Sequence, residues 1–242
     1  MQVWRPAPQS CSARIRAVHI QPYFPEPVEV GGNAAAERYG VTLRFIRSTM
    51  AGHAGSAFAV VAVAVLLEPA VSFELAGYVF LGCLLALTVV RRVLDGGILD
   101  NVLSLALLAP TIWSLGTVLR LASDSGSPVW VLGLGYVLAS LYGVFCGRDF
   151  SFVGQLVLTI IVLTIVLVTT TLLSGLSWGD AVRWGLLTLA YVTYYVYDLA
   201  ALLTRRRLGE APAAVADLYR DLLNFITYTV RIVLHWRRFR FI

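Results

Sequence analysis

The sequence predicts an all-α, polytopic membrane protein, and two observations carry this prediction. Of the 242 residues, 58% are hydrophobic and only 14% are charged, with a mean hydropathy of +0.77. A water-soluble domain needs far more polar surface than such a chain supplies. The apolar residues also form unbroken runs long enough to cross a bilayer, whereas a membrane β-barrel would show alternating apolar and polar residues.

The chain before the first apolar run differs in composition from the rest. Residues 1–46 hold five of the nine prolines, several charges and no long apolar stretch, which is typical of a flexible segment. No positively charged start with an apolar core and a small-residue cleavage site is found there, so we do not expect a signal peptide. We expect a flexible cytosolic N-terminal tail over 1–46, a membrane domain over 47–235 and a basic C-terminal tail over 236–242.

Six apolar runs follow at regular intervals, each close to the roughly 20 residues that a helix needs to cross the hydrocarbon core. Helices suit these runs because they satisfy their own backbone hydrogen bonds in lipid. In the fourth run, Gly135, Ala139 and Gly143 recur every four residues and would let a neighbouring helix approach closely. The runs are 48–67, 73–90, 102–119, 129–146, 153–176 and 184–203.

A seventh segment, 212–234, is long enough to span but is much more polar. It contains Asp217, Arg220, Asp221 and Arg231. A charge within the membrane costs about 2.5–3.5 kcal/mol on insertion scales, so these side chains cannot all face lipid. We therefore expect the other helices to enclose this one, which gives a seven-helix bundle with a central C-terminal helix.

The basic residues orient the bundle. All of them are arginines, and most lie in the N-terminal segment or in the even-numbered connections, which predicts a cytosolic N-terminus. Their dispersal over short loops argues against nucleic-acid binding. Seven full spans would place Arg237, Arg238 and Arg240 on the far side, so a last helix that re-enters the membrane stays open as an alternative.

The last two segments hold the candidate functional site. Asp217, Asp221, Asn224 and Tyr228 share one face of the seventh helix, and Asp198 lies near the end of the sixth. If Asp198 and Asp221 meet in a poorly solvated site, they cannot both ionise cheaply, so they share one proton and titrate as a unit. Losing that proton would push the helices apart, and a divalent cation, which prefers oxygen ligands, could replace it.

A structural interpretation of the same residues stays open. In it, Asp217 pairs with Arg220 along the helix, and Asp198 is solvated at the membrane surface beside Arg205. The cysteines and histidines share no metal-binding spacing, and no nucleophile, base and orienting group form a recognisable set. We therefore expect no bound metal, no cofactor and no enzymatic activity.

Four short motifs add a resemblance. They are Phe45-Ile46-Arg47, Arg148-Asp149-Phe150-Ser151-Phe152, Val196-Tyr197-Asp198 and Leu218-Tyr219-Arg220-Asp221-Leu222-Leu223-Asn224-Phe225. In this order they resemble the transmembrane Bax-inhibitor-motif (Bax inhibitor-1) family over roughly residues 44–234. The resemblance implies seven helices around a central last helix, a calcium leak through it, and a pH-sensitive aspartate pair at Asp198 and Asp221.

The resemblance also implies an arginine from the second helix near this pair, for which Arg91 and Arg92 are the candidates. Asp217 and Asn224 are further candidates for supporting the gate. Leu199 departs from the family, which commonly has a polar residue at that position. The proline-rich start and the all-arginine composition resemble the viral members of the family, such as those of cytomegaloviruses.

Residues and resemblance together predict a calcium-permeable, viroporin-like leak channel that modulates calcium homeostasis and cell survival. Calcium would be the permeant ion, and the partners would be the lipid bilayer and other membrane proteins. The expected location is the endoplasmic reticulum or another endomembrane, of a host cell if the chain is viral, with the plasma membrane as the alternative. Two other functions stay open: a non-conducting adaptor that regulates partner proteins, and a proton-coupled transporter that uses the same carboxylates.

Overall fold

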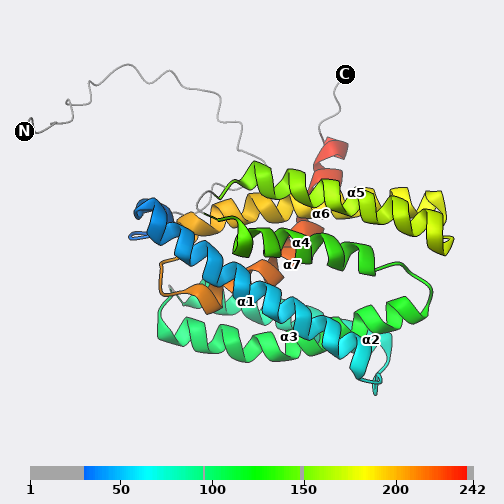
Figure 1. The fold of residues 1–242 in the computed structure, drawn as a ribbon. Coiled ribbons are helices and arrows are strands. Elements are labelled where there is room, and N and C mark those ends of the chain that lie inside the picture. Colours follow the sequence, from blue (N-terminus) through cyan, green and yellow to red (C-terminus); the bar gives the residue numbers. More distant parts are fainter. Residues whose placement is uncertain (1–29, 95, 148–149, 239–242) are drawn as a thin grey trace, which may run out of the picture.

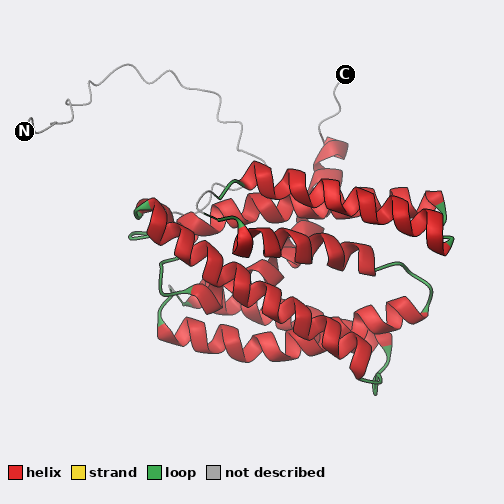
Figure 2. Ribbon diagram, in the orientation of Figure 1, coloured by secondary structure: helices red, strands yellow, loops and turns green. Residues whose placement is uncertain are grey.

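The computed structural model describes residues 30–94, 96–147 and 150–238, and for Ser174 and residues 228–238 it describes the backbone alone. In this part of the chain a short 3-10 helix, η1 (Ala34–Ala36), precedes seven α-helices, and no strand is present (Figures 1 and 2). The α-helices are α1 (Tyr39–Leu66), α2 (Phe73–Val93), α3 (Ile98–Asp124), α4 (Trp130–Phe145), α5 (Phe152–Ser174), α6 (Trp178–Arg205) and α7 (Ala211–Arg238).

Five helices, α1, α2, α3, α5 and α6, are long and apolar enough to cross a membrane. Many of their large apolar side chains are exposed on the outside of the bundle, among them Val89, Ile165 and Leu172. An exposed apolar surface of this extent is stable only against lipid or a partner. The helices therefore indicate an integral, multi-pass membrane protein.

The fourth apolar run forms a helix that is shorter than expected. We expect a span over 129–146, but α4 has 16 residues and rises about 24 Å at 1.5 Å per residue. The hydrocarbon core of a typical bilayer is about 30 Å thick. Pro128 precedes this helix and Gly147, at φ 67°, follows it, so the backbone is interrupted at both ends.

The structured part of the chain begins earlier than the composition indicates. α1 starts at Tyr39, and Thr42, Phe45 and Ile46, which fall within the expected tail, are buried in the bundle. Phe45 and Ile46 pack in the apolar core, and the Thr42 hydroxyl donates to the carbonyl oxygen of Ala34, so this first part of α1 is held in the bundle. Residues 1–29 lie outside the described residues. At the other end α7 continues to Arg238, and residues 239–242 of the expected basic tail lie outside.

Serine N-caps set where several helices begin. The side chains of Ser72, Ser151 and Ser177 each accept a hydrogen bond from the backbone N–H three residues later. These bonds satisfy a donor that the first turn of a helix would otherwise leave unpaired. The caps therefore fix the starts of α2, α5 and α6.

Helix α7 contacts α1, α2, α3 and α6 and passes behind α1 in the view of Figure 1. Its buried residues belong to two apolar clusters. Ala214 and Leu218 pack in a cluster with residues of α1, α4 and α6, whereas Val215 and Tyr219 pack in a second cluster with residues of α1, α2 and α3. The last helix therefore joins the two halves of the apolar core.

The small residues of α4 allow close packing, as their spacing predicts. A Cβ atom on Gly135 would collide with the methyl group of Thr188 in α6, and one on Gly143 would collide with the side chain of Met50 in α1. Ala139, between them, is fully buried. This prediction is confirmed, and the partners are α6 and α1.

We expect Gly135→Val to destabilise the protein by about 1–3 kcal/mol, the usual cost of overfilling a packed interior. Gly133→Val is the matched control, because a Cβ at Gly133 meets no atom within 4 Å and the two glycines lie on the same helix. Thermal unfolding in detergent would measure both variants. Equal losses of melting temperature would contradict the close contact between α4 and α6.

Candidate functional site

The site is built around the short connection between α6 and α7. This connection carries Arg206 and Arg207 after the last residue of α6, Arg205. The Arg206 side chain is only 1% exposed, whereas those of Arg205 and Arg207 are 20% and 48% exposed. One arginine of the run is therefore directed into the protein.

Arg206 contacts three carboxylates from three parts of the chain. Its Nε donates to Asp217 Oδ2 at 2.7 Å, and its Nη1 donates to Asp100 Oδ2 and lies 3.6 Å from Glu210 Oε2. Asp100, Glu210 and Asp217 are each at most 4% exposed. A buried charge is stable only when it is paired and hydrogen-bonded, so these residues depend on one another.

Two glycines let the α2–α3 loop approach this network. Gly96 and Gly97 have φ angles of 91° and 94°, which favour glycine, and a Cβ on Gly96 would collide with the Glu210 carboxylate. The Gly97 N–H donates to Glu210 Oε1 at 3.3 Å. The sharp loop thereby places Asp100, in the first turn of α3, against Arg206.

Burial works to lower the pKa of the Arg206 guanidinium, but the charges and hydrogen bonds of Asp217 and Asp100 outweigh it, so this pKa is raised. A raised pKa for an arginine means that the side chain stays charged at every physiological pH. Stability from this group is present below its unfolded pKa and is lost only at more alkaline pH. Arg206 is therefore a fixed charge and does not itself respond to pH near neutrality.

Asp217 is shared among several arginines. Besides Arg206, Arg220 Nη1 lies 3.5 Å from its Oδ1, and Arg91 Nε lies 3.9 Å from its Oδ2. Arg91 also donates from Nη2 to the backbone oxygen of Arg205 at 2.9 Å. The second helix is thus tied to both the α6 end and α7.

Asp198 and Asp221 form the second part of the site. Both are buried, at 2% and 1% exposure. Arg205 Nη1 donates to Asp198 Oδ1 and Asn224 Nδ2 donates to Asp221 Oδ1, each at 3.1 Å. The two carboxyl groups are close enough to interact electrostatically. Two carboxylates in a poorly solvated site cannot both ionise cheaply, so the pair favours one shared proton.

In each aspartate, one of the two carboxyl oxygens lacks a hydrogen bond from the other described residues. Asp198 Oδ2 and Asp221 Oδ2 are buried and receive no hydrogen bond from a nitrogen or hydroxyl donor in the described part of the chain. These oxygens could hold a proton or face a passing cation. In the part of the chain that the structure describes, no group of three His, Cys, Asp or Glu side chains is placed to hold a metal ion.

The structure brings together most of the residues that the sequence predicts. Asp198, Asp221 and Asn224 are neighbours, and the contacts of the structural interpretation, Asp217 with Arg220 and Asp198 with Arg205, exist as well. Asp198 is nevertheless buried, so its solvation at the membrane surface is wrong. Of the two arginines of α2, Arg91 contacts Asp217, while the Arg92 side chain is exposed. The side chain of Tyr228 lies outside the described residues.

Three network residues were not predicted from the sequence: Asp100, Arg206 and Glu210. Arg206 stands in a run of three arginines, which the sequence pattern assigns to topology as a whole. Asp100 stands in the first turn of α3 and Glu210 in the α6–α7 connection, positions where acidic residues are usually solvated. The sequence did hold one signal for these two residues, because each lies within five positions of a glycine in a turn. Only the fold shows that the α2–α3 loop and the α6–α7 connection meet.

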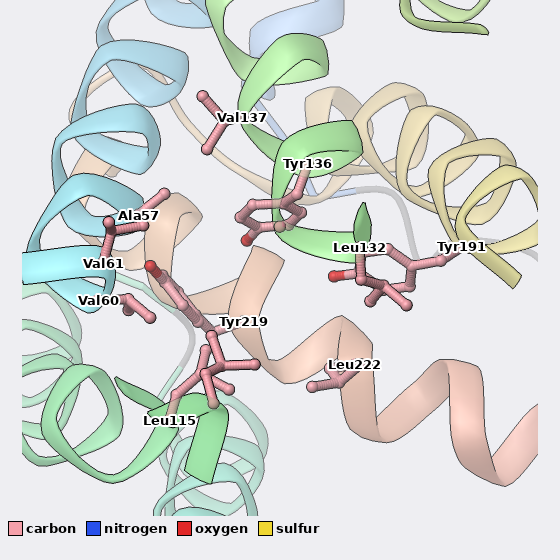
Figure 3. A pocket seen from close by; sticks show the side chains of 12 residues that line it. Ala57, Val60, Val61, Leu115, Leu132, Tyr136, Val137, Tyr191, Tyr219 and Leu222 are labelled. Carbon is pink, nitrogen blue, oxygen red and sulfur yellow. The ribbon is translucent and has the colours of Figure 1, made fainter. Parts of the chain in front are cut away.

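An apolar cavity of about 110 Å³ lies beside α7. Figure 3 shows Tyr136, Tyr191 and Tyr219 around it, together with aliphatic side chains from α1, α3, α4 and α7. The Tyr219 hydroxyl donates to Ser56 Oγ at 2.8 Å, and the Tyr136 hydroxyl lies 3.2 Å from Nδ1 of the buried His53. Apolar walls of this kind disfavour water and ions.

Comparisons of the chain with protein-family models, with curated proteins and with solved structures find no match.

We expect Arg206→Ala to destabilise the protein by roughly 3–5 kcal/mol, because it leaves Asp100 and Asp217 buried without their main partner. Arg183→Ala is the control, since the Arg183 side chain is 79% exposed and its pairing with Asp180 is on the surface. Melting temperatures in detergent would measure both changes. If both variants melted at the temperature of the unmodified protein, the buried network would not hold the fold.

Proposed function

We propose that the chain is a calcium-permeable leak channel of an intracellular membrane, with Asp198 and Asp221 as its proton-sensitive gate. The observation that carries this proposal is the pair itself. Two buried carboxyl groups from α6 and α7 are electrostatic neighbours, and each has one buried oxygen that receives no hydrogen bond from the described residues. Ionisable residues inside a membrane protein mark ion and proton paths by default.

The gate would work through the shared proton. With one proton between them, the carboxyl groups attract and hold α6 against α7. Without it, two negative charges repel each other in a poorly solvated site, and the helices separate. Arg205, which pairs with Asp198, and Arg220 offset part of this repulsion, while Asp217 adds to it. A calcium ion entering between the carboxylates would replace the proton as the positive charge.

We also propose that α7 is the central, ion-conducting helix. Its contacts with α1, α2, α3 and α6, and its share in both apolar clusters, support this role. The apolar cavity lined by Tyr136, Tyr191 and Tyr219 would then be the dry, closed portion of the path. The resemblance to the Bax inhibitor-1 family supports an endomembrane location and an effect on calcium homeostasis and cell survival.

We expect purified protein to carry calcium into dye-loaded liposomes, with a flux that rises between roughly pH 6 and pH 8 as the shared proton is lost. Asp198→Asn and Asp221→Asn each remove one of the two charges that repel. Both variants should therefore lose most of this pH dependence. Fluorescence of the trapped dye, recorded at several external pH values, would measure it.

The control is Asp124→Asn, because Asp124 is a half-exposed carboxylate at the end of α3, where it pairs with Arg120. This variant should keep the pH dependence of the unmodified chain. If Asp198→Asn and Asp221→Asn also kept it, the gate would be misassigned. If no variant carried calcium above the level of empty liposomes, a non-conducting adaptor would replace the channel as the best interpretation.

A further inference from the structure

We propose that residues 30–37, which we call the clasp, restrain the gate by holding the α6–α7 connection in place. This inference rests on the proposed channel function and names a regulation of the same site. The clasp comprises Val30, the turn at Gly31 and Gly32, Asn33, η1 and Glu37. It follows directly on the part of the chain that the structure does not describe.

The clasp is bound to the connection by main-chain hydrogen bonds. The Val30 N–H donates to the carbonyl oxygen of Thr204 at 3.0 Å, and the Ala34 N–H donates to that of Arg206 at 2.8 Å. In return, Arg207 Nε donates to the carbonyl oxygen of Gly31 at 3.2 Å. Ala34 is fully buried in this contact.

The carbonyl of Arg205, between those of Thr204 and Arg206, is bound by a different helix. The carbonyl oxygen of Arg205 accepts the hydrogen bond from Arg91 of α2. Three successive carbonyls, at Thr204, Arg205 and Arg206, are therefore fixed by groups from outside α6. The last carbonyls of a helix have no partner within it, so these bonds decide where the end of α6 lies.

The side chains of Arg205 and Arg206 balance the negative charge of the buried aspartates. Arg205 binds Asp198, and Arg206 binds Asp100 and Asp217. Backbone and side chain of each arginine move together. A shift of the connection therefore weakens the neutralisation of Asp198 and Asp217 at once, and the unbalanced charge favours separation of α6 from α7.

The clasp also has a firm attachment on its other side. Its carbonyl at Ala34 accepts a hydrogen bond from Thr42 Oγ1 of α1 at 2.7 Å, and the Asn33 side chain caps η1 through the N–H of Ala36 at 3.0 Å. The clasp thus bridges α1 and the end of α6. Releasing it frees the connection while α1 keeps its place in the bundle.

Ala34→Pro removes the bond to Arg206 and places the proline Cδ against the carbonyl oxygen that accepted it, so the substitution forces the clasp away from the connection. Proline has no N–H, and it fits the first position of a helix. The preceding Asn33, at φ −68° and ψ 164°, already has the extended conformation that proline requires before it. Ala34→Ser is the matched control, because it keeps the N–H at similar size.

The first readout is independent of ion flux. Trypsin cuts after arginine, so cleavage of the full-length protein in detergent after Arg205, Arg206 or Arg207 reports the freedom of the connection. We expect Ala34→Pro to raise this cleavage rate about fivefold, the factor that loss of one net hydrogen bond produces. Ala34→Ser should leave the rate unchanged.

The second readout is calcium flux in the same liposomes. Ala34→Pro should raise the flux at a pH where the unmodified chain is mostly closed. A reversible lock covers the case in which this variant fails to fold. Its background is a chain in which Cys11, Cys83 and Cys146 are replaced by serine. Val30→Cys and Thr204→Cys are then introduced so that a disulfide between them holds the clasp on the connection. This disulfide should lower the calcium flux, and a reductant should restore it.

The outcomes separate the inference from the proposed function. Faster cleavage together with higher flux, or a flux that the lock lowers and the reductant restores, supports the clasp. Unchanged cleavage in Ala34→Pro overturns it, as does a measurable flux that neither Ala34→Pro nor the lock alters. Absence of flux in every variant, including the unmodified chain, overturns the channel and with it the control of a gate by the clasp.

Discussion

The structure depends on one buried arginine and the carboxylates that surround it. Arg206 connects the start of α3, the α6–α7 connection and α7 through Asp100, Glu210 and Asp217. No single helix could keep these charges out of water, because each costs several kcal/mol to bury alone. The network therefore requires that the helices assemble together, and it makes the polar α7 compatible with an otherwise apolar protein.

The sequence predicts the helices well because their signal is local. The apolar runs and the repeat of Gly135, Ala139 and Gly143 each act within a few turns of chain, and the structure contains them. The candidate pair could also be predicted, since Asp198 and Asp221 are acidic residues where apolar ones are expected. The charged partners were harder. The sequence around Arg206 does not distinguish it from an exposed arginine. Its burial follows from the contact between two loops that are far apart in the chain.

The two carboxylate clusters differ in what they can do. In the Arg206 network, acidic groups contact guanidinium groups that stay charged, so its electrostatics are constant over the physiological pH range. In the Asp198–Asp221 pair, one oxygen of each carboxyl group receives no hydrogen bond from the residues that the structure describes. A rigid, permanently charged frame next to a pair that depends on a single proton is the arrangement that a pH-responsive element needs. In the proposed gate, the frame would fix the helices and the pair would add the pH response.

The length of α4 has a consequence for the surrounding lipid. A helix of about 24 Å is shorter than the hydrocarbon core of most bilayers, so for α4 to cross one, the lipid would thin locally or flanking polar residues would extend. This mismatch costs a fraction of a kcal/mol per Å, so it is smaller in the endoplasmic reticulum bilayer of about 27 Å than in a plasma membrane of about 32 Å. Bilayer thickness would thus act on the protein through α4, and thinner membranes would accommodate it at the lower elastic cost.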